Sequence, residues 1–150
     1  MEKHVLSSGS NPIISSEYLA FTLGKEEYAL NIGQVREIRK YEPVTRIATA
    51  PEHVKGFINL RGEIIPILDL RIKLSMGEAS YTDLTTVVIT DADDKKVGFV
   101  VDGVSDVLDI QENQKHPLPD MGKRGVEHIL GLGVIDERTL ALVDATRLAA

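Results

Sequence analysis

Apolar and polar residues alternate in short runs along most of the chain, and turn-forming residues separate these runs. The runs at 18–23 and 28–32 flank a polar turn and predict a β-hairpin. The runs at 54–60 and 63–70 flank a turn that contains glycine and predict a second hairpin. Because proline cannot donate a hydrogen bond to a neighbouring strand, Pro66 predicts that its strand lies at a sheet edge or carries a bulge.

A second set of strands and turns begins near residue 84 and repeats the order of the first. Its expected strands cover residues 84–90, 97–101, 129–135 and 139–144. Gly56 precedes Asp69 by 13 positions, and the same interval separates Gly131 from Asp144. A short helix or tail is expected after each aspartate. The repeat indicates an internal duplication in which the two aspartates are equivalent, although any all-β protein shows strands, turns and glycines at such intervals.

Apolar residues also recur at intervals of three beyond the paired runs. These residues are Ile32, Val35 and Ile38, and then Val104 and Val107. A short helical turn or a bent strand would present the first three on one side of the fold. A further short strand is expected at 44–47.

Strands that recur at intervals of roughly 8–12 residues are typical of sandwiches and barrels. We therefore expect an all-β fold with short helices and two small β-barrel halves, about 17–80 and 81–150. Because each half is small, the two are expected to share a hydrophobic core. Residues 1–16 carry no periodic pattern and are expected to form a flexible N-terminal arm.

The chain has 150 residues, of which 43% are hydrophobic and 27% charged, as in a soluble globular domain. No apolar run approaches the ~20 residues that span a bilayer, and polar residues interrupt the stretch near Met1 where a secretory segment would lie. With 17 basic and 23 acidic side chains, the net charge of −6 argues against nucleic-acid binding. A cytoplasmic protein without direct membrane contact is expected.

Signatures of catalysis and of metal binding are weak in this sequence. Cysteine is absent, and the four histidines show no metal-binding spacing. Asp91, Asp93 and Asp94 lack the glycine and the distant glutamate of a calcium loop, so a solvated turn is expected there. No serine stands in a nucleophile motif, and Gly131 and Gly133 precede a strand instead of a helix. We expect no catalytic residue, no metal and no cofactor.

Surface recognition is better supported than catalysis. Arg61 lies in a turn where Gly62 can supply positive φ, so its guanidinium projects outward and can grip a carboxylate. A soluble turn residue without a binding role is the alternative. The apolar residues spaced by three belong to a core in most proteins, but their recurrence in both halves suggests that equivalent edges line a groove. Such a groove suits an amphipathic helix.

Six stretches together resemble the CheW-type coupling proteins of bacterial chemotaxis. The resemblance extends from about Glu17 to Leu148, and the order and spacing of the stretches make it specific. The stretches are FTLGKEEY at 21–28, VREIR at 35–39, VTRIA at 44–48, GFINLRG at 56–62, IIPILDLR at 64–71 and VVDGVSDVL at 100–108.

The resemblance implies two SH3-like five-stranded barrels packed around a common hydrophobic core. It also implies an adaptor without catalytic activity, which joins the cytoplasmic hairpin tip of methyl-accepting chemoreceptors to the regulatory domain of the CheA histidine kinase. That regulatory domain has the same double-barrel fold. A monomer in isolation, with separate surfaces for kinase and receptor, is expected.

The resemblance also implies residues for each surface. The receptor-binding positions are Ile32, Val35, Glu37, Ile38, Arg61, Val100, Val101 and Val104. The kinase-binding positions are expected at Glu42, Pro43, Val44, Thr45 and Arg46. Two alternatives stay open: a regulatory domain cut from a longer kinase, and a small β-barrel enzyme or ligand carrier. The arm that begins at Met1 and the end of the chain soon after Leu148 favour a free adaptor.

Overall fold

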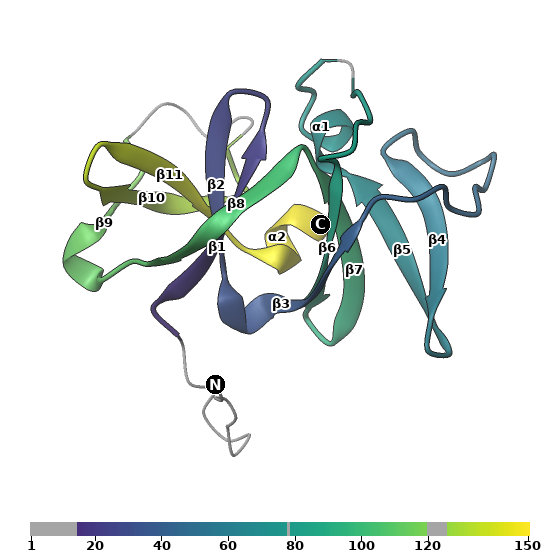
Figure 1. Ribbon diagram of the computed structural model, residues 1–150, viewed down its shortest axis with the longest axis horizontal. Helices are drawn as coiled ribbons and strands as arrows, with labels where there is room; N and C mark the ends of the chain where they lie inside the picture. Colours follow the sequence, from purple (N-terminus) through teal and green to yellow (C-terminus); the bar gives the residue numbers. More distant parts are fainter. Residues whose placement is uncertain (1–14, 78, 120–125) are drawn as a thin grey trace.

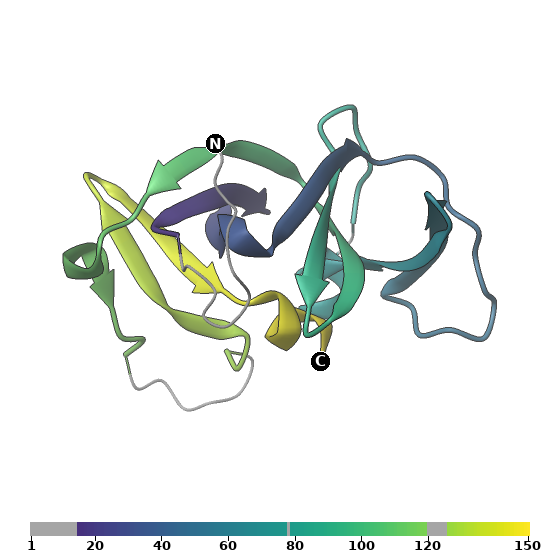
Figure 2. The ribbon, with the colours of Figure 1, turned by 90° about the horizontal axis from the view of Figure 1, so that it is seen from below.

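The chain folds into two β-sheets that are joined side by side, with short helices between them (Figures 1 and 2). These features come from a computed structural model, which describes residues 15–77, 79–119 and 126–150. The all-β class and the two small SH3-like barrels expected from the sequence are confirmed. Residues 1–14 of the expected arm lie outside the described residues.

The first sheet has the strand order β8-β1-β2-β11-β10-β9. Its strands are β1 (Glu17–Leu23), β2 (Glu26–Asn31), β8 (Gly103–Asp109), β9 (Lys115–His116), β10 (Ile129–Ile135) and β11 (Arg138–Val143). The second sheet has the order β3-β6-β7-β5-β4. Its strands are β3 (Val35–Lys40), β4 (Val54–Leu60), β5 (Glu63–Asp69), β6 (Thr86–Ala92) and β7 (Lys95–Val101). The second sheet has the five strands expected, and the first adds the two-residue strand β9.

The two sheets do not follow the expected division near residue 80. Strand β3 leaves the first hairpin and pairs antiparallel with β6 in the second sheet. Strand β8 leaves the later hairpin and pairs antiparallel with β1 in the first sheet. Each repeat thus lends its third strand to the other hairpin. The first barrel is built from both ends of the chain and the second from its middle, which the linear order of strands did not reveal.

The internal duplication is confirmed by matching details in the two sheets. Asp69 follows β5, which pairs parallel with β7, and its side chain caps helix α1 (Leu70–Lys73). Asp144 follows β11, which pairs parallel with β2, and its side chain likewise caps a helix, α2 (Ala145–Ala149), through the N–H of Arg147. The register between hairpin strands shifts just before Gly56 in one sheet and just before Gly131 in the other.

Two local expectations need correction. The strand expected at 44–47 is reduced to one antiparallel bridge between Thr45 and Phe57, and no other residue of that segment pairs with a strand. Pro66 lies on β5, which is an inner strand of its sheet. The pairing of β5 with β7 covers only Ile67 to Asp69, so the missing N–H of Pro66 removes no bond from it.

The last two residues of the expected arm are held by the fold. The carbonyl oxygen of Ser16 accepts a hydrogen bond from the Ile110 N–H at 2.8 Å. The carbonyl oxygen of Ser15 accepts one from the Asn31 amide at 2.7 Å. Ser15 and Ser16 therefore belong to the fold and not to a free arm.

One hydrophobic cluster is shared by both sheets and by the two α-helices. Its buried members include Leu19, Phe21, Leu23 and Leu30 from the first sheet, Leu68, Val88, Phe99 and Val101 from the second, and Leu70, Ala145 and Leu148 from the helices. The residues that alternate with these along the strands point to the opposite side, into a smaller apolar cluster inside each barrel. Ala20 belongs to the cluster of the first barrel and Val100 to that of the second. Strands buried on both faces explain the continuous apolar runs in the sequence.

A matched pair of glycines tests this architecture. Gly56 has a φ of +150°, and a Cβ there would overlap the carbonyl oxygen of Thr45. Gly62 has a φ of +91°, but a Cβ there would meet no atom within 4 Å. Gly62→Ala should therefore lower the free energy of unfolding only through backbone strain, by about 1–3 kcal/mol. Gly56→Ala should lower it further, because the 45–57 bridge must also separate. Urea unfolding measures both, and equal losses would contradict the close approach at Gly56.

Candidate functional site

A groove of about 560 Å³ opens where the two sheets meet. Its walls come from β3, from the turn that precedes β6, and from the start of β8. Ile38, Leu84 and Val104 are its large apolar side chains, and Asp83 and Asp102 are its acidic ones. The groove is therefore a product of the strand exchange, since one wall belongs to each sheet.

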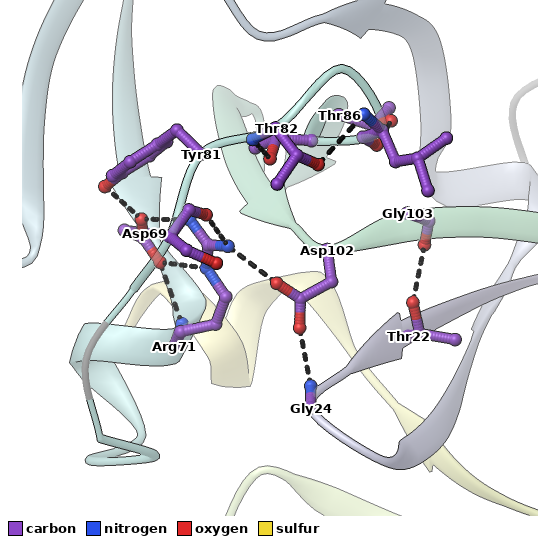
Figure 3. Close-up of polar contacts among 12 residues, drawn as sticks. Thr22, Gly24, Asp69, Arg71, Tyr81, Thr82, Thr86, Asp102 and Gly103 are labelled. Carbon is purple, nitrogen blue, oxygen red and sulfur yellow. Dashed lines mark hydrogen bonds and ion pairs between the residues drawn. The ribbon is translucent and has the colours of Figure 1, made fainter.

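Asp102 is the single residue between β7 of the second sheet and β8 of the first. Its N–H donates to the carbonyl oxygen of Thr22 at 3.0 Å. Its carboxylate accepts a hydrogen bond from the Gly24 N–H at 2.5 Å and another from Arg71 Nη1 at 2.6 Å (Figure 3). Because Gly24 lies in the β1–β2 turn and Arg71 in α1, this one side chain ties the two sheets together beside the groove.

Arg71 and Asp69 form a buried ion pair behind Asp102. The Arg71 Nε donates to one Asp69 carboxylate oxygen at 2.9 Å, and Nη2 donates to the other at 2.8 Å. Both residues are almost fully buried. The Tyr81 hydroxyl donates to Asp69 at 2.6 Å, and its ring lies 4.9 Å from the Arg71 guanidinium carbon (Figure 3). Such bidentate pairs fix geometry as well as charge.

The electrostatics of this cluster keep its members in their usual charge states. Burial alone would raise the pKa of the Asp69 carboxyl, but hydrogen bonds from Arg71 and Tyr81 and the charge of Arg71 bring it below its ordinary value. Burial and the hydrogen bond to Asp69 raise the pKa of the Tyr81 hydroxyl. Asp69 therefore stays ionised and Tyr81 stays protonated at neutral pH.

The other crossing between the sheets is joined by an uncharged side chain. It runs from β2 to β3 through the short 3-10 helix η1 (Ile32–Gln34). The Gln34 amide donates to the Asp144 carboxylate at 2.9 Å and accepts from the Ala145 N–H at 3.1 Å. Gln34 thus contacts the capping aspartate of α2 directly, whereas Asp102 is linked to the capping aspartate of α1 through Arg71. The crossing from β7 to β8, which is held by the ion pair of Asp102 and Arg71, lies beside the groove, because Asp102 also lines the groove.

The expected receptor-binding residues separate into groups in the structure. Ile38 is 46% exposed, and it lines the groove together with Val104. Ile32 and Val35 are half-buried and pack against the shared core, so they do not join Ile38 on one side.

Val100 and Val101 need a correction, because both are fully buried. Val101 belongs to the shared core and Val100 to the core of the second barrel. They offer no surface to a partner.

Arg61 and Glu37 form an ion pair, and Glu37 precedes the groove residue Ile38 on β3. Arg61 Nη2 lies 2.6 Å from a Glu37 carboxylate oxygen, which connects the β4–β5 turn to the edge strand β3 and closes the second barrel. The Arg61 side chain is 74% exposed. The first barrel has a counterpart in Arg138, which pairs with Asp106 of β8 and also with Glu27. Among the described residues, Arg138 thus has two carboxylate partners and Arg61 has one.

The expected kinase-binding residues form a largely exposed stretch after β3. Glu42, Pro43 and Val44 border a hollow of about 110 Å³, separate from the groove. Val44 also packs against the core of the second barrel. Thr45 has a structural role, since its N–H and carbonyl exchange hydrogen bonds with Phe57. Arg46 is exposed.

The groove is also lined by Leu84, Asp83 and Asp102, which the sequence did not predict as site residues. Leu84 was expected to open a strand, but β6 begins at Thr86 and Leu84 is exposed instead. The sequence carries a weak signal for the exposure of Leu84, because the two residues on either side of it are polar.

Among residues 15–77, 79–119 and 126–150, no cluster of three or more His, Cys, Asp or Glu side chains is arranged to hold a metal ion. None of the helices in these residues has the length and apolarity to cross a membrane.

Comparison with known proteins gives consistent relatives. The family model described as CheW-like domain matches residues 17–150. The chain is 46% identical over 136 residues to the chemotaxis protein CheW of Klebsiella aerogenes, covering 90% of this chain and 82% of that protein. It is 32% identical over 128 residues to CheW of Bacillus subtilis, covering 85% and 82%. The crystal structure of the scaffolding protein CheW from Thermoanaerobacter tengcongensis superposes with a TM-score of 0.83 at 29% identity, covering 91% and 92%.

The buried pair predicts how stability depends on pH. Asp69→Asn should lower the free energy of unfolding at pH 7 by about 3–5 kcal/mol, because Arg71 stays buried with one anionic partner fewer. The pKa of Asp69 is lower in the folded state. Its ionic contribution is therefore complete above the unfolded pKa of about 3.9 and disappears as the pH falls through the folded value.

The difference between wild type and Asp69→Asn should consequently shrink between pH 5 and pH 2 in urea unfolding experiments. Asp93→Asn, in the exposed β6–β7 turn, is the matched control and should show no such change. A difference between wild type and Asp69→Asn that stays constant over this range would contradict the buried ion pair.

Proposed function

The chain belongs to the family of CheW-like domains, and from this premise we propose that it is a non-catalytic adaptor of chemotaxis signal transduction. It couples methyl-accepting chemoreceptors to the CheA histidine kinase. Its similarity to proteins named chemotaxis protein CheW and to one described as a scaffolding protein supports this assignment. Coupling takes place in the cytoplasm, at receptor arrays.

The groove between the sheets receives the cytoplasmic tip of the receptor. The observation that carries this assignment is an exposed apolar residue of β3, Ile38, which lines the same groove as Val104 of β8. A groove with apolar walls accommodates an amphipathic helix, whose apolar face then becomes buried. Glu37 precedes the groove residue Ile38 on β3, and the exposed guanidinium of its partner Arg61 can exchange their solvent-facing ion pair for a carboxylate of the receptor.

The regulatory domain of the kinase binds elsewhere, on the stretch that contains Glu42, Pro43 and Arg46. These three residues are exposed. The hollow beside Glu42 and Pro43 shares no lining residue with the groove, although strand β3 contributes residues to both. Separate surfaces allow receptor and kinase to bind at the same time. The adaptor itself is a monomer in isolation.

Arg61→Ala separates recognition from folding. The residue lies in an exposed turn, so the free energy of unfolding should change by no more than about 0.5 kcal/mol. Loss of a charge-assisted hydrogen bond at the receptor interface should weaken receptor binding by about 1.5–3 kcal/mol, or roughly tenfold to a hundredfold. Calorimetric titration with a receptor cytoplasmic fragment, beside a thermal melt, measures both quantities.

Arg46→Ala is the matched control, because it removes the same side chain from the proposed kinase surface. It should weaken binding of the kinase regulatory domain and leave receptor binding unchanged. A folded Arg61→Ala protein with wild-type receptor affinity would remove Arg61 from the receptor site. Competition between receptor and kinase for the adaptor would contradict the proposal of two separate surfaces.

A further inference from the structure

We propose that Leu84 is a specificity-determining contact of the groove, and that the helix it selects carries an apolar side chain beside a basic one. This inference rests on the proposed function, in which the groove receives the receptor tip. It adds a third apolar element, from the turn before β6, to the two strands that form the groove walls.

Leu84 is exposed to an unusual degree for its position. Its relative exposure is 74%, against 64% for Ile64 and 51% for Leu130, the next most exposed large apolar residues in the described part of the chain. Single apolar residues on a surface are common, so exposure alone assigns no role. What distinguishes Leu84 is that it lines the same groove as Ile38 and Val104.

The turn that carries Leu84 is held rigid by threonine hydroxyls. The Thr82 hydroxyl accepts from the Leu84 N–H at 3.1 Å, and the Thr85 hydroxyl accepts from the Thr82 N–H at 2.8 Å (Figure 3 shows Thr82). The Thr86 hydroxyl donates to the Leu84 carbonyl oxygen at 2.8 Å. Thr85 itself is buried. A partner that covers Leu84 therefore orders little additional backbone, which favours tight binding.

The charges around Leu84 define the chemistry of the partner. The groove lining contains two carboxylates and no Lys or Arg side chain. The Asp102 carboxylate already accepts hydrogen bonds from Arg71 and Gly24. Asp83 is fully exposed, and its nearest cation is Lys40 Nζ at 3.9 Å, an arrangement with little binding energy of its own. Asp83 is thus available to a basic side chain that lies next to the residue covering Leu84.

Titration of the full chain with a receptor cytoplasmic fragment tests the inference. Leu84→Ala should weaken binding about tenfold, because the buried apolar area of the leucine is lost. Ile64→Ala is the matched control, since Ile64 is an exposed isoleucine on β5 outside the groove, and it should stay within about twofold of wild type. Both variants should melt at the wild-type temperature.

Asp83→Asn tests the charge. It should weaken receptor binding at low salt, and the difference from wild type should vanish at high salt, because an exposed ion pair is screened. An Asp83→Asn protein with wild-type affinity at low salt would overturn the basic character assigned to the partner.

Ile38→Ala separates this inference from the proposed function. If Ile38→Ala weakens receptor binding and Leu84→Ala does not, Leu84 lies outside the interface and the inference is wrong, while the proposed function stands. If neither Ile38→Ala nor Arg61→Ala affects receptor binding, the proposed receptor groove itself is wrong. If Leu84→Ala weakens only kinase binding, Leu84 belongs to the kinase surface and the inference is overturned.

Discussion

Neither sheet of this protein buries both of its faces alone, and the core shared between them is the constraint that shapes the rest of the structure. Leu19, Phe21 and Leu23 of β1 point into the same cluster as Phe99 and Val101 of β7. Burial of side chains of this size contributes about 1.5–3 kcal/mol each. Separation of the sheets would expose these side chains to water, and much of the stability of the fold would be lost. The exchange of β3 and β8 follows the same constraint, because each hairpin is completed by a strand that crosses over the shared core.

The two crossings have the same topology but different chemistry. At one of them, the uncharged side chain of Gln34 donates a hydrogen bond to the capping aspartate of α2 and accepts one from the Ala145 N–H. At the other, Asp102 binds Arg71, which is itself held by the capping aspartate of α1. A buried ion pair adds little net stability, but breaking it leaves an unpaired buried charge, so it resists alternative arrangements. Its position beside the groove suits a site whose walls must keep a fixed separation.

The sequence predicted the strands, the hairpins and the duplication, including the equivalence of Asp69 and Asp144. It could do so because alternation, turn glycines and capping aspartates are local signals. The family resemblance added the two barrels and their shared core. The exchange of β3 and β8 was not predictable from strand order, since both hairpins offer the same edge. Burial of Val100 and Val101 was missed because β7 is covered on both faces, so its apolar residues form one continuous run. Leu84 was missed because its exposure depends on a turn fixed by hydroxyl groups.

The central claim is that one binding groove exists only where the two sheets meet, with a wall from each. Methyl NMR during titration of the intact protein with a receptor cytoplasmic fragment tests it most directly. The account predicts that the signals of Ile38 on β3 and Val104 on β8 shift together and yield one dissociation constant, while Leu130, an exposed residue that does not line the groove, keeps its position. Shifts confined to one wall, or largest at Leu130, would contradict it.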